Sequence, residues 1–104
     1  MIFQGMEKEK LKSIKQLLGC YFHQDWMAEF DSSKDALRAI SVSEPKGMIL
    51  DCVAEIDNIL VTQPSESDLR MLFAEMLGCY VDPGSEQLTY QQWLIRVRRK
   101  LAQV

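Results

Sequence analysis

Apolar residues recur at spacings of three and four positions along most of the chain, which is the period of an amphipathic α-helix. The widest apolar stripe follows Pro45 and consists of Ile49, Cys52, Val53, Ile56, Ile59 and Leu60. No segment alternates apolar and polar residues over more than about four positions, so strands are not expected. The pattern therefore predicts an all-α protein.

Start and stop signals divide this pattern into five helices, or six. A first helix is predicted over residues 7–18, with Gly19 as its C-terminal stop. Ser32 and Ser33 offer an N-cap for a short second helix, and Pro45 suits the first turn of the central helix.

Two more helices are predicted beyond Pro64. Ser65 with Asp68 approximates a capping box for a helix that ends at Gly78, and Thr89 can cap the last helix. We therefore expect a compact bundle of five to six helices that forms a single domain over residues 6–104. Residues 1–5 are expected to be an expression remnant or a disordered leader.

The tetrapeptide Leu-Gly-Cys-Tyr occurs twice, at residues 18–21 and 77–80. Both copies are interpreted as the same helix stop, in which a left-handed glycine is followed by apolar residues that fold back on the helix. The flanking sequences differ, so the two copies do not indicate a repeat protein.

Composition argues against a membrane, metal or disulfide protein. No apolar run reaches the roughly 18 residues of a membrane span, and no signal peptide is visible, so a cytoplasmic location is expected. Cys20, Cys52 and Cys79 are widely spaced and sit among apolar neighbours, which predicts three reduced, buried thiols. With a single histidine in the chain, a standard zinc site is excluded.

Charge is segregated along the chain. Residues 19–88 carry 13 Asp and Glu against four Lys and Arg, whereas both ends are basic. An acidic surface repels nucleic acid and anionic lipid and attracts basic proteins. The sequence therefore favours a basic protein partner, with a merely solubilising acidic surface as the alternative.

Catalytic constellations are missing from the sequence. His23 and Asp25 stand two positions apart, but no serine or cysteine nucleophile accompanies them. The basic stretch 96–100 suits a helix C-terminus, so direct nucleic-acid binding is not expected. We expect no enzyme activity, no cofactor and no metal.

The hexapeptide Tyr21, Phe22, His23, Gln24, Asp25 and Trp26 carries a resemblance to a known family. The chain resembles the immunity proteins of contact-dependent growth inhibition (CDI) systems that share this signature. Further similar stretches follow in family order at residues 35–39, 54–57, 67–70, 77–80 and 90–94.

This resemblance implies a protein that binds and neutralises the C-terminal toxin domain of an exported effector. Many such toxins are nucleases with basic clefts, which the acidic middle of the chain could plug. A monomer that pairs with the toxin as a heterodimer is expected. The alternative is an acidic adaptor or regulator that binds another basic protein.

The resemblance also divides the candidate residues into two groups. Tyr21, Phe22 and Trp26 are interpreted as core, with His23 and Asp25 as polar residues that fix the scaffold. Partner binding is predicted for a polar ridge opposite the central apolar stripe and for neighbouring acidic residues. These residues are Asp51, Glu55, Asp57, Asn58, Glu66 and Asp68.

Overall fold

The computed structural model describes residues 8–103, and within that range the chain forms helices and no strand. The elements in chain order are η1 (Lys8–Leu11), α1 (Lys12–Tyr21), α2 (Trp26–Glu29), α3 (Ser33–Ser43), α4 (Lys46–Val61), α5 (Glu66–Met71), η2 (Leu72–Leu77), η3 (Pro83–Glu86) and α6 (Tyr90–Leu101). The predicted all-α class with five to six helices is confirmed.

Local capping signals mark the starts of α3, α5 and α6 and the end of η2 as predicted, whereas Pro45 precedes the first turn of α4 as its N-cap residue. The Ser32 side chain accepts a hydrogen bond from the backbone N–H of Asp35 and caps α3. Ser65 and Thr89 begin α5 and α6 with complete capping boxes. Gly78 ends η2 in the left-handed conformation, with φ of 64°.

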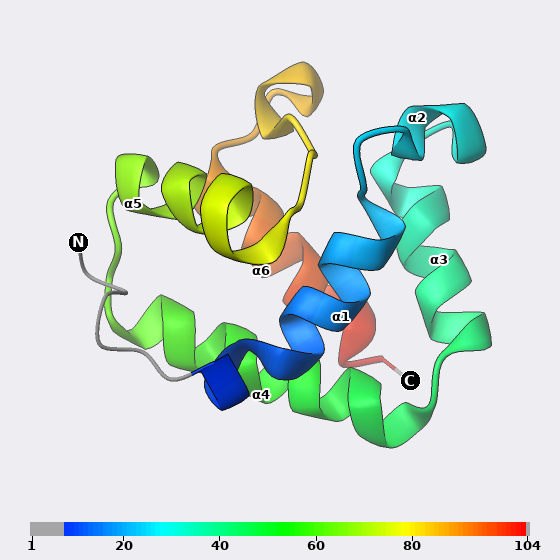
Figure 1. The fold of residues 1–104 in the computed structure, drawn as a ribbon, viewed down its shortest axis with the longest axis horizontal. Coiled ribbons are helices and arrows are strands. Elements are labelled where there is room, and N and C mark those ends of the chain that lie inside the picture. Colours follow the sequence, from blue (N-terminus) through cyan, green and yellow to red (C-terminus); the bar gives the residue numbers. More distant parts are fainter. Residues whose placement is uncertain (1–7, 104) are drawn as a thin grey trace.

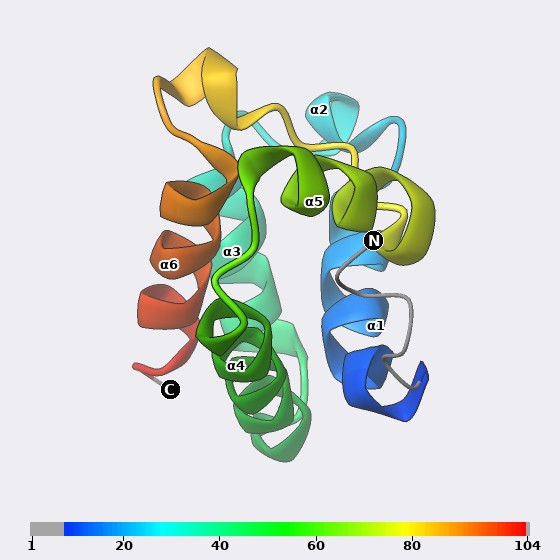
Figure 2. The ribbon, with the colours of Figure 1, turned by 90° about the vertical axis from the view of Figure 1, so that its left-hand side faces the viewer.

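The helices surround one central core (Figures 1 and 2). Figure 2 shows α1 and α6 on opposite sides, with α4 below them and the α5–η2 segment above. Five aromatic rings link these elements. Trp93 on α6 meets Phe22 and Phe73 edge-on, at centroid distances of 5.1 and 5.6 Å, while Trp26 packs on Phe22 and Tyr90 on Phe73.

The first helix differs from its prediction. The α-helical turns begin at Lys12 and continue through Gly19 to Tyr21, so Gly19 does not stop the helix. A Cβ atom at Gly19 would lie 2.5 Å from the carbonyl oxygen of Leu77. Glycine is therefore needed here for close approach between α1 and the end of η2 and not for a left-handed cap.

The two Leu-Gly-Cys-Tyr tetrapeptides consequently have different structures and contact each other. Only the second contains a left-handed glycine, Gly78. Just after Gly78, the backbone N–H of Tyr80 donates to the carbonyl of Phe22 at 2.7 Å. This bond and the Gly19 contact hold the chain leaving α1 beside the chain leaving η2 (Figure 1).

The cysteine prediction holds for two thiols and is wrong for the third. Cys52 and Cys79 are buried, whereas Cys20 is exposed because it lies on the outer face of α1. Burial raises the pKa of the Cys52 and Cys79 thiols to about 12.

We predict that Gly19→Ala destabilises the protein by about 1 to 3 kcal/mol, because the new methyl group must displace the Leu77 carbonyl. Gly47→Ala is the matched control, since a Cβ there meets nothing within 4 Å and alanine favours the helix by up to about 1 kcal/mol. Urea unfolding of both variants measures the difference. Equal stability of the two variants would contradict the close-approach role.

We also predict that iodoacetamide modifies only Cys20 in the native protein at pH 8, as mass spectrometry can show.

The free energy of unfolding should also depend on pH, and the sign follows from the raised pKa values of Cys52 and Cys79. Unfolded thiols ionise near pH 8.5, so the native state holds these two protons more tightly. Their contribution to stability is complete below about pH 8.5 and is lost as the pH rises toward 12.

Candidate functional site

Carboxylates are concentrated in the two segments that the α1–η2 contact brings together. Residues 22–35 and 79–89 carry six carboxylates against one basic residue, Lys34. We call this region the acidic end; its carboxylates belong to Asp25, Glu29, Asp31, Asp35, Asp82 and Glu86.

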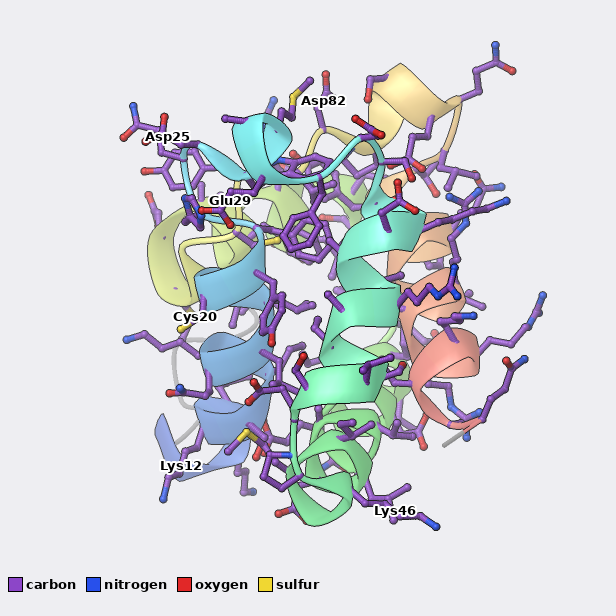
Figure 3. All side chains as sticks on the ribbon, turned by 90° about the vertical axis from the view of Figure 1, so that its right-hand side faces the viewer. Lys12, Cys20, Asp25, Glu29, Lys46 and Asp82 are labelled. Atoms are coloured by element: carbon purple, nitrogen blue, oxygen red, sulfur yellow. The ribbon has the colours of Figure 1, made fainter. Side chains whose placement is uncertain are left out.

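Figure 3 shows Asp25, Glu29 and Asp82 at one end of the molecule and Lys12 and Lys46 at the other. Lys12 and Lys46 therefore lie away from the acidic end. Arg96 of the basic C-terminal stretch does reach it, where it forms an ion pair with Glu86 at 2.7 Å.

The conformation of the acidic end depends on His23. Its Nδ1 accepts a hydrogen bond from the backbone N–H of Asp25 at 3.1 Å, and its Nε2 lies 3.1 Å from the carboxylate of Glu29. Because Nδ1 is an acceptor, the proton resides on Nε2, which donates to Glu29. The imidazole thus ties the loop before α2 to the end of α2.

The remaining hexapeptide residues divide between core and surface. Phe22 and Trp26 are buried, and Tyr21 is half-buried with its hydroxyl donating to Glu44 at 2.9 Å. Gln24 and Asp25 are exposed. Part of the motif therefore belongs to the acidic end itself.

Two large side chains stand exposed among these carboxylates. Met27 on α2 is 76% exposed, and Tyr80, just before η3, is 59% exposed. Tyrosine is enriched at interface hot spots, and methionine adapts its shape to a partner. Apolar anchors within a charged rim are the usual anatomy of a protein-binding surface.

The polar ridge predicted on α4 is only partly available to a partner. Asp51 and Asn58 are exposed and make no side-chain hydrogen bond with any described residue. Glu55 instead turns toward α1, where its carboxylate accepts hydrogen bonds from the backbone N–H groups of Ser13 and Ile14. It thereby caps the N-terminus of α1, which has no cap of its own.

The other acidic residues predicted for binding also have partners within the chain. Asp57 forms a bidentate ion pair with Arg98, at 2.7 and 3.3 Å. Glu66 accepts from the backbone N–H groups of Tyr90 and Gln91 at the start of α6, and Asp68 completes the capping box of α5. These carboxylates stabilise helix ends or a helix pair.

Sequence reasoning missed Met27, Tyr80 and the acidic end as a unit. The runs of Asp and Glu in the two segments are visible in the sequence. Their proximity depends on the contact of Gly19 with Leu77, which joins residues far apart in the chain. No local sequence pattern predicts this proximity.

Other chemistry is sparse within residues 8–103. No group of three or more His, Cys, Asp and Glu side chains is placed to hold a metal ion there. None of the helices in that range is both long and apolar enough to cross a membrane. A shallow hollow of about 520 Å³ beside Gly19 is lined by Lys12, Lys15 and the exposed Cys20.

Comparisons with known proteins agree on one family. None of the curated proteins compared is significantly similar to the chain. One chain of the crystal structure of a CdiA-CT/CdiI complex from Y. kristensenii superposes with a TM-score of 0.81 at 26% identity, covering 88% of this chain and 98% of that chain. The family model of the CdiI immunity proteins matches residues 10–101. The chain therefore belongs to the CdiI immunity protein family.

Proposed function

We propose that this protein binds and neutralises the cognate CDI toxin C-terminal domain inside the cell that produces it. The family match over residues 10–101 is the observation that carries this proposal. The similarity to a chain from a toxin–immunity complex supports it. The protein acts in the cytoplasm by occupying the toxin and not by catalysis.

The acidic end is the surface that we propose contacts the toxin. Asp25 and Asp31 have no hydrogen-bonding partner for their side chains among the described residues, and Met27 and Tyr80 supply apolar anchors beside them. On α4, by contrast, Asp51 is the one predicted carboxylate left without such a partner. Exposed Leu50 and Val61 make α4 the second candidate surface.

The charge of the acidic end supports a basic partner. A basic cleft, such as one that holds the phosphates of a nucleic acid in a nuclease, is complementary to it. The toxin is therefore proposed to be a basic nuclease. An adaptor that binds some other basic protein is the alternative, and its gene would not stand next to that of a long effector.

We predict that Asp25→Lys/Asp31→Lys weakens binding of the toxin domain by about 2 to 5 kcal/mol, because it places positive charge against a basic cleft. The matched control is Asp51→Lys/Asn58→Lys on α4, which also replaces two exposed polar residues without side-chain partners among those described. Calorimetric titration measures affinity, and circular dichroism checks that both variants fold.

The two variants test where the toxin docks, and the parent protein tests whether it binds a toxin domain at all. If the α4 variant loses binding and the acidic-end variant keeps it, the toxin docks on the α4 ridge. If both variants bind as the parent does, neither surface is the interface. A parent protein that binds no toxin domain would refute the proposed function itself. The earlier candidates Glu55 and Asp57 are left unchanged, because their substitution would also remove a helix cap or an ion pair.

A separate prediction concerns Tyr80. Tyr80→Ala should accelerate dissociation of the toxin about tenfold or more, since an aromatic side chain that becomes buried in a complex acts mainly on the dissociation rate. The backbone N–H of residue 80 can still donate to the carbonyl of Phe22 in this variant, so its free energy of unfolding should stay within about 0.5 kcal/mol of the parent value. Surface plasmon resonance at two salt concentrations measures the rates. An unchanged dissociation rate would place Tyr80 outside the interface.

A further inference from the structure

A basic groove between α3 and α6 begins beside the acidic end, which contributes Lys34 and Asp35 to its lining. Lys34 and Arg38 on α3, and Arg96 and Lys100 on α6, line a cavity of about 380 Å³. Leu37 and one carboxylate, Asp35, complete its lining. Four cations around one cavity contrast with the net charge of −3 of the whole chain.

The spacing of these cations follows the helical repeat. Each helix contributes two basic residues four positions apart, which is about 6 Å along a helix axis. A second cavity of about 170 Å³ is lined by Arg38 and Lys100 together with Ser41 and Gln103. The two cavities share Arg38 and Lys100 and therefore form one continuous groove. Residue numbers rise in the same direction along this groove on α3 and α6, which lie side by side in Figure 3.

Most of this positive charge is uncompensated within the described chain. One terminal nitrogen of Arg96 donates to Glu86 at 2.7 Å, and Glu86 also accepts from Ser33. Lys34, Arg38 and Lys100 form no ion pair with a described residue. Like charges four residues apart on a helix repel each other, so a bound anion would relieve this repulsion.

We propose that the groove binds the phosphate chain of a small triphosphate compound. Each pair of facing cations, Lys34 with Arg96 and Arg38 with Lys100, would meet one end of that chain. The guanidinium fork suits phosphate oxygens, and the cavity has the volume of a small-ligand pocket. A long polyanion is disfavoured, because it would extend over the acidic end, while Ser41 and Gln103 can hydrogen-bond a group attached to the phosphates.

The test uses the complete protein without toxin, so its result does not depend on the proposed function. Calorimetric titration with inorganic tripolyphosphate at fixed ionic strength should show saturable binding of one ligand per chain. Arg38→Gln/Lys100→Gln should weaken this binding tenfold or more. Lys12→Gln/Lys15→Gln, which removes two cations lining the hollow beside Gly19, should change it less than twofold.

Three results would overturn the proposal. These are the absence of saturable binding to the parent, equal weakening in the two variants, and tighter binding of a hexaglutamate peptide than of tripolyphosphate at the same groove. A parallel titration with ATP identifies the source of the phosphates. Tenfold tighter binding of ATP supports a nucleoside triphosphate, and equal affinity supports recognition of the phosphate chain alone. Circular dichroism of both variants verifies that they fold.

Discussion

The contact between the end of α1 and the end of η2 determines the surface on which the proposed function depends. Gly19 lets α1 approach the carbonyl of Leu77 at a distance that a Cβ atom would forbid. The backbone bond from Tyr80 to Phe22 then aligns the two chains that leave these helices. Because both chains continue into short, acidic segments, the contact assembles one negatively charged end from parts distant in sequence.

Much of the remaining negative charge stabilises the fold. Glu55 and Glu66 each accept two backbone N–H groups at the beginning of another helix, α1 and α6 respectively, where the helix dipole favours a carboxylate. Such bonds satisfy donors that a helix leaves unpaired in its first turn. An acidic composition therefore overstates the charge available to a partner, and a hydrogen-bond assignment for each carboxylate is needed to locate the binding surface.

This distinction also separates what the sequence could predict from what it could not. The caps at Ser32, Ser65 and Thr89 were predictable, because each depends on a partner three residues away. The roles of Gly19 and Glu55 were not, because their partners lie about 40 or more residues away and no period in the sequence links them. The α4 ridge was placed correctly on the helix, but the periodicity could not show that α1 turns Glu55 away from solvent.

The hexapeptide joins the scaffold to the proposed interface. Phe22 and Trp26 anchor it in the aromatic core around Trp93, while His23 holds the loop between them by bonding the Asp25 backbone and the Glu29 side chain. A loop fixed at both ends loses little conformational entropy when a partner binds, which lowers the cost of association. Specificity for one toxin is then expected to reside in exposed side chains beside this loop, such as Met27 on α2 and Asp31 after it, and not in the buried rings.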